Sequence, residues 1–370
     1  LIPTYSRRLQ EARILFMPTN GAGLGHVTRL LAIARRLKTE SRIAECVFLT
    51  TSDALTILRQ EGFVAYHLPS PDLLRGRIKS TGWNRYLRDL LGMIIANHEL
   101  NASVFDGVYP YSGITNAIAR RKNILKVWVK RGMLKEYVGE RVRAGEKYFN
   151  LVIIPGELGH SNVFQDSEKC ITVPSIVFLE RSELLPRDEV VSALGLDSRK
   201  KTALIQLGAG NINDIETQAE IVIDTVSRFD NIQVVLASSV IAQRSLKGVR
   251  SVKIITDYPL SRYYLGFDFA ITAAGYNTVA ELTYFGVPSI FIPNLQTGAD
   301  DQVRRATLAA ASGTSLVVHP FSVTRLEECL AVMLDDKKNA EFRKCCLSCL
   351  TVNGAESVVA ILTQALFGPK

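Results

Sequence analysis

The chain alternates apolar segments of strand length with amphipathic segments of helix length. In residues 1–172 the strand-like runs lie at 12–18, 46–51, 63–68, 103–106, 124–129 and 150–154, and helical patterns at 26–39, 53–61, 84–97 and 112–121. A strand that is followed by a crossover helix and another strand forms a parallel pair. The pattern therefore predicts an α/β fold with a doubly wound parallel sheet.

The same alternation restarts after a seam. Residues 173–200 mix prolines, charges and short apolar runs, which is typical of a linker with one small helix. Strand-like runs follow at 202–210, 232–239, 252–258, 269–275 and 289–294, with helices over 214–229 and 277–285 and from 299 onward. We predict two Rossmann-like domains, 1–172 and 201–354, that face across a cleft. A C-terminal helix over 355–370 can return to the first domain.

Charge is distributed unevenly between the two halves. Residues 1–186 hold 26 Lys and Arg against 17 Asp and Glu, whereas the remainder holds 18 against 19. This asymmetry predicts that the first domain faces an anionic partner, either a lipid surface or a phosphorylated substrate. Nucleic acid is not expected, because no zinc-finger spacing, RNA-binding motif or helix-turn-helix pattern accompanies the charge.

Composition also constrains the cellular context. The apolar runs are shorter than the roughly 18 residues of a membrane-spanning helix, and no signal-peptide pattern precedes the first strand. Six cysteines in 370 residues indicate a reducing compartment, and the Cys-Cys-Leu-Ser-Cys cluster has no fourth ligand for a zinc site. We therefore expect a cytoplasmic protein, with a possible peripheral site at the inner face of a membrane, and no metal.

A glycine-rich turn follows the first strand. Gly21, Gly23 and Gly25 precede His26, and the third glycine comes one position too early for a dinucleotide fingerprint. The glycines allow a tight turn whose amides, with the helix N-terminus, form an anion site. His26 in the first helical turn can act as a general base near neutral pH. The alternative is that His26 only caps or packs the loop.

A second motif lies in the C-terminal half. A strand ends at Gly275, a helix begins near Asn277, and Glu281 falls one turn inside it. Such a helix N-terminus can bind a pyrophosphate, and the glutamate can bind the vicinal hydroxyls of a ribose. After another strand, Asp301 and Gln302 are expected at the sugar end of the ligand.

Together these segments resemble the GT-B glycosyltransferases, in particular the inverting branch with family 28, which forms lipid II, and the family 1 UDP-glycosyltransferases. The G-x-G-H turn of that family matches residues 23–26, and its donor motif matches 274–281. Further matches are the G-V-P turn at 286–288, Pro293, Asp301 with Gln302, and a glycine turn with Gly208 and Gly210. The resemblance covers nearly the whole chain in order.

The resemblance implies an inverting, metal-independent glycosyltransferase without a cofactor. The co-substrate would be a nucleotide-diphosphate sugar, expected to be UDP-linked, and the acceptor a hydroxyl, with a lipid-linked or cell-envelope glycan as the candidate. Retaining members usually carry a glutamate at the position of Ala274, which supports inversion. His26 would be the base, with Gly23 and Gly25 in its loop. Donor contacts would come from Gly208, Gly210, Gly275, Asn277, Thr278, Glu281, Asp301 and Gln302.

Several alternatives stay open at this level. Asp106, at a strand end of the first domain, is either the acidic partner of His26 or a loop-capping residue. Ala273-Ala274-Gly275 replaces the His-Gly-Gly of many relatives, and 254–260 lacks their base-stacking tryptophan. The G-x-G-H-V-x-R stretch also resembles nucleotide-sugar hydrolases of sialic-acid-like sugar biosynthesis, and a catalytically silent nucleotide-sugar binding protein is a third interpretation.

The acceptor side has one candidate segment. Residues 73–100 interleave basic residues with aromatic and apolar ones: Arg75, Arg77, Lys79, Arg85 and Arg88 with Trp83 and Tyr86. This pattern fits a basic interfacial helix on anionic lipid or a lipid-phosphate acceptor. An ordinary amphipathic helix with a charged face explains it slightly better.

Overall fold

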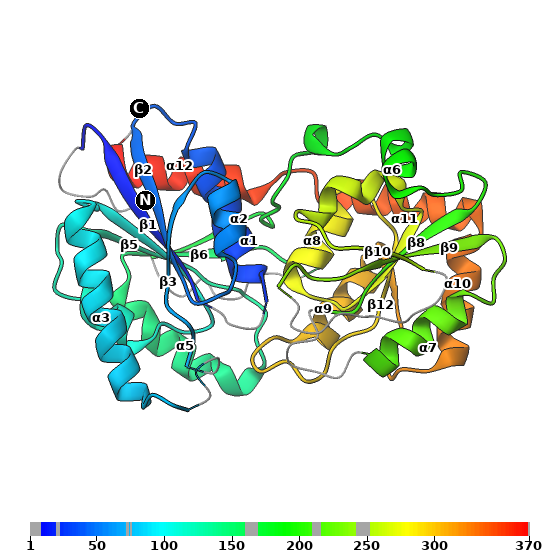
Figure 1. Ribbon diagram of the computed structural model, residues 1–370, viewed down its shortest axis with the longest axis horizontal. Helices are drawn as coiled ribbons and strands as arrows, with labels where there is room; N and C mark the ends of the chain where they lie inside the picture. Colours follow the sequence, from blue (N-terminus) through cyan, green and yellow to red (C-terminus); the bar gives the residue numbers. More distant parts are fainter. Residues whose placement is uncertain are drawn as a thin grey trace. The chain divides into compact units, whose positions relative to one another are not determined.

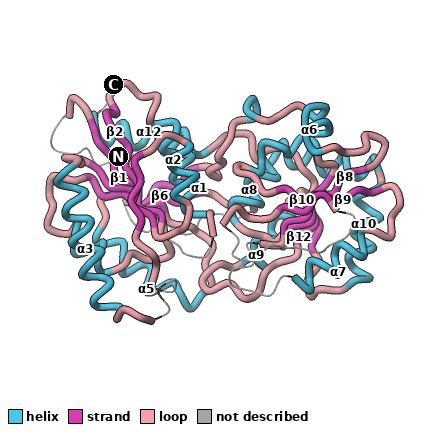
Figure 2. The backbone as a smooth tube through the Cα atoms, viewed as in Figure 1, coloured by secondary structure: helices cyan, strands magenta, loops and turns pink. Residues whose placement is uncertain are grey.

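The computed structural model describes residues 9–19, 23–71, 74, 76–159, 169–208, 216–241 and 252–368. Its contacts divide the chain into two compact units. Unit 1 comprises Leu1–Gly156, Asn162–Ile176 and Gly354–Lys370, and unit 2 comprises Glu157–Ser161 and Val177–Asn353. Each unit has its own parallel sheet, drawn in magenta in Figure 2.

Unit 1 contains, within the described residues, a seven-stranded parallel sheet in the order β3-β2-β1-β4-β5-β6-β7. The strands are β1 (Ala12–Pro18), β2 (Ile43–Thr50), β3 (Val64–His67), β4 (Ala102–Asp106), β5 (Leu125–Val129), β6 (Leu151–Pro155) and β7 (Cys170–Val173). Its helices include α1 (Gly25–Leu37), α2 (Leu55–Gln60), α3 (Ser80–Asn97), α4 (Ser112–Ile118) and α5 (Gly139–Gly145) (Figure 1). The doubly wound sheet is thereby confirmed.

Unit 2 repeats this architecture with six described strands in the order β10-β9-β8-β11-β12-β13. These are β8 (Lys201–Gln206), β9 (Ile232–Ala237), β10 (Lys253–Ile255), β11 (Phe269–Thr272), β12 (Ser289–Phe291) and β13 (Ser315–Val317). The helices are α6 (Arg187–Leu194), α7 (Glu216–Val226), α8 (Tyr276–Tyr284), α9 (Gln302–Ala311), α10 (Val323–Leu334) and α11 (Asp336–Cys349). Side chains of α7 and α10 pack with those of β8, β9 and β11 in one apolar core.

In each sheet the strand order reverses between two central neighbours. The reversal lies between β1 and β4 in unit 1 and between β8 and β11 in unit 2. The loops that leave the carboxyl ends of such a strand pair diverge to opposite faces, which opens a crevice where α/β proteins bind ligands. The strand order therefore selects the loops after β1, β4, β8 and β11 as candidate sites.

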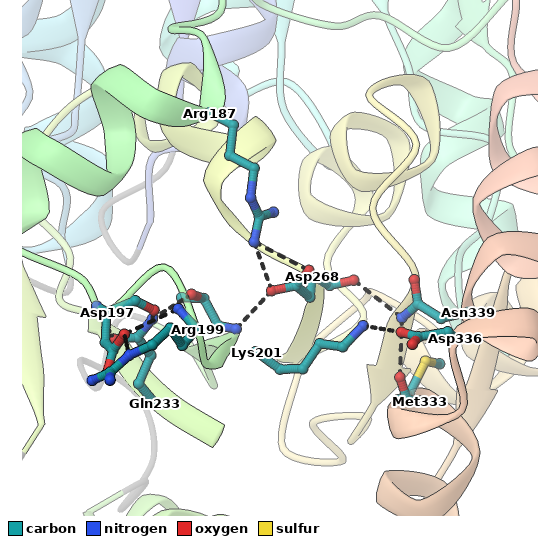
Figure 3. Close-up of polar contacts among 10 residues, drawn as sticks. Arg187, Asp197, Arg199, Lys201, Gln233, Asp268, Met333, Asp336 and Asn339 are labelled. Carbon is teal, nitrogen blue, oxygen red and sulfur yellow. Dashed lines mark hydrogen bonds and ion pairs between the residues drawn. The ribbon is translucent and has the colours of Figure 1, made fainter. Parts of the chain in front are cut away.

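The amino edge of the unit 2 sheet is closed by a polar network (Figure 3). Asp268, just before β11, accepts hydrogen bonds from the backbone N–H of Thr202 at 2.7 Å and from Arg187 at 3.1 Å. Asn339 of α11 donates to the backbone carbonyl of Asp268, and Lys201 pairs with Asp336. These contacts attach α6 and α11 to the edge opposite the candidate ligand loops.

The C-terminal helix α12 (Gly354–Phe367) belongs to unit 1 and packs against α1. Its first residue approaches the backbone after β7 so closely that a Cβ at Gly354 would lie 1.9 Å from the carbonyl oxygen of Pro174. Among the described residues, the stretch Asp336–Phe367 contains an 18-residue window that is apolar enough to cross a membrane, with a mean hydropathy of 1.7, but half of that window is buried. Core packing accounts for that apolar character.

Candidate active site

His26 and Asp106 meet at the reversal point of the unit 1 sheet. Asp106 is the last residue of β4 and pairs in register with Pro18, the last residue of β1. His26 is the second residue of α1, which follows β1 through the glycine turn. Its Nδ1 lies 2.5 Å from Oδ1 of Asp106, and the two residues are 4% and 0% exposed. Asp106 thus contacts the imidazole, as expected for an acidic partner.

The glycine turn itself leaves room beside the imidazole. A Cβ at Gly23 would meet nothing within 4 Å, and one at Gly25 would meet only the Arg29 guanidinium, at 3.9 Å. Neither residue is among the glycines with positive φ. Open space rather than backbone strain is therefore the structural feature of Gly23 and Gly25, whereas Gly21 lies outside the described residues.

Arg29 is a third member of this cluster. Its Nε donates to Oδ2 of Asp106 at 2.9 Å, and its Nη2 donates to Oδ1 at 2.9 Å. Nη2 also lies 2.9 Å from Nδ1 of His26. Since a carboxylate only accepts, the 2.5 Å contact requires Nδ1 of His26 to carry a proton and to donate a hydrogen bond to Asp106. Nη2 of Arg29 then donates to Oδ1 of Asp106 and not to Nδ1. Nε2 then holds the lone pair, and no described residue forms a hydrogen bond with it.

Burial and charge set the ionisation of this cluster. Burial lowers the pKa of His26; Asp106 opposes that effect, whereas the charges of Arg29 and Arg131 add to it. Burial alone would raise the pKa of Asp106, but Arg29 and His26 outweigh it, so that the pKa lies below its ordinary value. At neutral pH Asp106 is therefore a carboxylate and His26 a neutral imidazole. A neutral imidazole with an open Nε2 can accept a proton.

The second candidate site is the reversal point of the unit 2 sheet. Gly208 follows β8 with a φ of +125°, a conformation that favours glycine, and a Cβ there would meet nothing within 4 Å. Gly275 caps α8, with Asn277 and Thr278 half-buried in the first turn. A Cβ at Gly275 would meet only Oγ1 of Thr278, at 3.8 Å. The α8 N-terminus can therefore approach an anion closely, whereas Gly210 lies outside the described residues.

Glu281 lies one turn into α8, as the sequence predicts. Burial raises the pKa of its carboxyl to about 8, although a backbone N–H from Phe178 stabilises the charged form. No described cation forms an ion pair with it. A partly exposed carboxyl that is mostly protonated at neutral pH can both donate to and accept from neighbouring hydroxyl groups.

A buried arginine cluster supports the β11–α8 turn. Arg305 of α9 donates through Nη1 to the carbonyl oxygen of Ala274 at 2.9 Å. Its Nε and Nη2 donate to Glu157 at 2.5 and 3.2 Å, and Nη2 also donates to Asp300 at 2.8 Å. The Asp300 carboxylate is thus largely buried against this guanidinium. Sequence reasoning missed Arg305, since its partner Glu157 is 148 positions away.

Asp301 and Gln302 bind the chain itself. Asp301 is the N-cap of α9, and its side chain accepts from the backbone N–H of Arg304 at 3.0 Å. Oε1 of Gln302 accepts from the backbone N–H of Asn294 at 3.0 Å. Their side chains thus hold the loop between β12 and α9. They remain candidate donor residues by position, since the sugar end of a ligand at α8 would meet this loop.

Helix α3, the basic segment that was expected on the acceptor side, has a buried face and an exposed face. Trp83 is buried and donates through Nε1 to the carbonyl oxygen of Pro69, so it is a core residue and not an interfacial one. Tyr86 and Met93 are each 61% exposed on α3, and Ile78 just before it is 48% exposed. Arg77, Lys79, Arg85 and Arg88 are exposed beside them, and Arg75 lies outside the described residues.

Within the described ranges, no group of three or more His, Cys, Asp or Glu side chains could hold a metal ion. Of the cysteine cluster, Cys346 is buried and contacts the carbonyl oxygen of Thr314, while Cys349 is exposed.

Comparison with known proteins gives the same family on several counts. Residues 196–348 match the glycosyltransferase family 28 C-terminal domain. The UDP-N-acetylglucosamine--N-acetylmuramyl-(pentapeptide) pyrophosphoryl-undecaprenol N-acetylglucosamine transferase of Aquifex aeolicus is 29% identical over 44% of this chain and 47% of its own length. The enzyme of the same name from Paenarthrobacter aurescens is 22% identical over 80% and 81%. The match thus spans about half the length of the first relative and four-fifths of the second.

Solved structures agree on the fold. The spinosyn forosaminyltransferase SpnP has a TM-score of 0.69 at 17% identity, covering 96% of this chain and 99% of that one. Acinetobacter baumannii MurG has a TM-score of 0.63 at 16% identity, covering 95% and 99%. Residues 196–348 therefore match a glycosyltransferase family 28 C-terminal domain, and the two parallel-sheet units with their solved neighbours show that the chain has the GT-B fold.

Proposed function

We propose that the protein is an inverting, metal-independent glycosyltransferase that uses a nucleotide-diphosphate sugar and an acceptor hydroxyl. The observation that carries the proposal is the 2.5 Å contact between Nδ1 of His26 and Asp106 at the reversal point of the unit 1 sheet. It leaves Nε2 as the proton acceptor, which a direct displacement at a sugar carbon requires.

In the proposed step, Nε2 of His26 takes the proton from the acceptor hydroxyl. The acceptor oxygen forms a bond to the anomeric carbon from the face opposite the nucleotide, and the bond between that carbon and the diphosphate oxygen breaks. The leaving diphosphate keeps the electron pair, and the anomeric configuration inverts. Asp106 stabilises the imidazolium that forms.

The donor would bind to unit 2. The α8 N-terminus and the glycine turn after β8 would carry the diphosphate charge through backbone amides, which is why no metal is required. Glu281, with its pKa near 8, would bind the ribose hydroxyls. The curated relatives act on a UDP-sugar by name, which supports a uridine nucleotide.

The acceptor would bind to unit 1 near Asp106. A cavity of about 460 Å³ is formed by the loop after β4 together with the starts of α3 and α4 and the end of α5. Its lining includes Tyr109, Tyr111 and Tyr148 with Asn84 and Lys147. Aromatic faces with amide and ammonium donors suit a saccharide that carries an anionic group. The names of these relatives specify a pyrophosphoryl-undecaprenol acceptor, which supports a lipid-linked one here.

Membrane contact would place such an acceptor within reach, and the protein would then be peripheral on the cytoplasmic side. Tyr86 and Met93, seven residues apart, lie on one exposed face of α3, and Ile78 is exposed just before the helix. Exposed arginines and a lysine lie in the same segment. In flotation assays we expect binding to vesicles with anionic lipid and little binding to neutral vesicles. The variant Tyr86→Ser/Met93→Ser should bind less, whereas Val352→Ser in unit 2 should bind as the wild type does.

One assay separates the candidate reactions. Incubation with UDP-sugars and lipid-linked or soluble acceptors, followed by NMR of the product, should show transfer with inverted configuration that persists in EDTA. Release of free sugar without an acceptor would instead identify the nucleotide-sugar hydrolase, in which His26 activates water. Nucleotide binding with neither reaction would identify a silent binding protein.

A further inference from the structure

We propose that Arg29 is a positioning residue of this site. It fixes both oxygens of Asp106 and balances the charge of that carboxylate, so that Asp106 orients His26 while the imidazole stays neutral. Its catalytic consequence rests on the proposed function, but the geometry and its first test do not.

Arg29 and His26 bind the same carboxylate, that of Asp106, and the guanidinium binds it through two nitrogens. Nε and Nη2 of Arg29 contact Oδ2 and Oδ1 of Asp106, each at 2.9 Å, so the guanidinium approaches in its bidentate mode. Oδ1 also accepts the Nδ1 proton of His26. One carboxylate is therefore held by three donors, and the imidazole plane can turn only if that network breaks.

The position of Arg29 follows from helical spacing. His26 and Arg29 lie three residues apart on α1, which places both side chains on the face that meets the end of β4. Gly25 contributes space, since a Cβ there would lie 3.9 Å from the guanidinium. Arg29 is only 2% exposed, and burying an arginine is costly unless a carboxylate compensates it.

The charges around His26 come from three elements. Asp106 at the end of β4 is negative, whereas Arg29 on α1 and Arg131 after β5 are positive, and these are the charged groups of the described residues that act on the imidazole. In a histidine–aspartate pair alone, the carboxylate favours the imidazolium. Here burial lowers the pKa of His26 most, and Arg29 offsets part of the opposing effect of Asp106, so the carboxylate orients an imidazole that stays neutral.

NMR of histidine-labelled protein tests this without substrate. The chain has five histidines, and His26→Gln assigns the signals of His26. We expect the wild type to show a neutral imidazole with the proton on Nδ1 at pH 7. In Arg29→Gln the titration midpoint of His26 should rise by about one pH unit or more, because an uncompensated carboxylate then faces the imidazole.

Two further variants isolate charge from geometry. Arg29→Lys keeps the charge but loses the fork, so the midpoint should stay near that of the wild type while the tautomer signal broadens. Asp106→Asn leaves Arg29 uncompensated, so the midpoint should fall below that of the wild type. Arg35→Gln is the matched control on the same helix, because Arg35 pairs with Glu61 at 3.1 Å, and the midpoint should not move.

The proposal is overturned if folded Arg29→Gln keeps the wild-type midpoint and tautomer, because Arg29 would then be only a structural link between α1 and β4. It is also overturned if Arg29→Lys raises the midpoint as far as Arg29→Gln does. Should Arg29→Gln not fold, the midpoints of Arg29→Lys and Asp106→Asn decide, since a rise in either contradicts the charge balance. With active enzyme, the acid limb of kcat/KM should follow the same midpoints; a protein without turnover leaves the NMR result standing and refutes only the proposed function.

Discussion

Two buried arginines of this protein meet carboxylates at the carboxyl edge of a parallel sheet, and they differ in how their charge is shared. Arg29 in unit 1 and Arg305 in unit 2 are each 2% exposed. Among the described residues, Arg29 contacts one carboxylate, which also accepts a hydrogen bond from an imidazole. Arg305 contacts two carboxylates and a backbone carbonyl. Among the described residues, the Arg29 cluster contains a titratable imidazole whose Nε2 can accept a proton, and the Arg305 cluster contains no such group.

The difference has a chemical meaning. The Arg305 guanidinium, whose pKa is raised further by Asp300 and Glu157, cannot exchange a proton near neutral pH. It fixes the carbonyl of Ala274, and with it the start of α8. In the Arg29 cluster Asp106 instead orients His26, while burial, with help from Arg29 and Arg131, keeps the imidazole neutral. We infer that one cluster serves the chemistry and the other keeps a binding turn rigid.

The largest expected effect is on turnover, from His26→Gln. Without the imidazole the acceptor proton has no base, so kcat should fall by about 10²- to 10⁴-fold. The midpoint of thermal unfolding should change little by comparison, because glutamine can still donate to Asp106. Steady-state assays with calorimetry on the same sample give both values. His98→Gln is the control, since His98 contacts Glu45 and Tyr66 elsewhere in unit 1 and should leave kcat unchanged.

Arg305→Met should show the opposite profile. Removing the guanidinium leaves Glu157 and Asp300 buried without compensation, which costs about 3–5 kcal/mol of unfolding free energy. The unfolding temperature should drop by roughly 10 °C for a unit of this size. The adjacent Arg304→Met changes an exposed side chain and should stay within about 0.5 kcal/mol. An Arg305→Met protein as stable as the wild type would show that this cluster is not a structural tie.

The sequence predicted one of these clusters and not the other. His26 and Asp106 follow adjacent central strands, so topology alone placed both at one edge, although only the structure shows their contact. The sequence pattern places Arg29 on the solvent-exposed face of an amphipathic helix. Its spacing of three residues from His26 was the available signal that it belongs to the same cluster. Arg305 stands in an Arg-Arg pair whose second member is buried, and no local pattern reveals a partner as distant as Glu157.

Short and half-exposed elements were missed for a related reason. The four-residue β7 and three-residue β13 each have a single fully buried side chain, so neither forms an apolar run. Asp301 was interpreted as a sugar contact, but an aspartate just before a helix is also a common N-cap, and that is the contact its side chain makes. Pattern reasoning thus located the loops better than it resolved their side chains.

The pH dependence of kcat/KM should distinguish the Arg29 cluster from the Arg305 cluster. His26 must be neutral to accept a proton, and burial with Arg29 holds its pKa below the ordinary value of 6.5. Activity should therefore be lost as the pH falls through a midpoint below 6.5. Arg305→Lys should leave the midpoint of this acid limb of the pH profile unchanged, because the described residues of the Arg305 cluster include no group whose ionisation controls catalysis. A limb above 6.5, or one that moves in Arg305→Lys, would contradict the assignment.

The smallest expected effect concerns Glu281, a carboxyl that has no arginine. Its pKa of about 8 in the fold exceeds the ordinary 4.5, so the protonated form is favoured. The stabilisation of the fold that the protonated Glu281 carboxyl contributes is fully present below pH 4.5 and is lost as the pH rises through about 8. Glu281→Gln cannot ionise, so its unfolding temperature should exceed that of the wild type increasingly between pH 6 and pH 9. The same variant should bind UDP about 10- to 100-fold more weakly, because an amide does not reproduce the O–H donor of the protonated carboxyl or its ionised form, and a hydrogen bond to the ribose is lost. Glu220→Gln, on the exposed face of α7, should change neither quantity. A variant that gains stability at high pH but binds UDP as the wild type does would separate the buried carboxyl from the donor site, and the donor would then have to be placed elsewhere on unit 2.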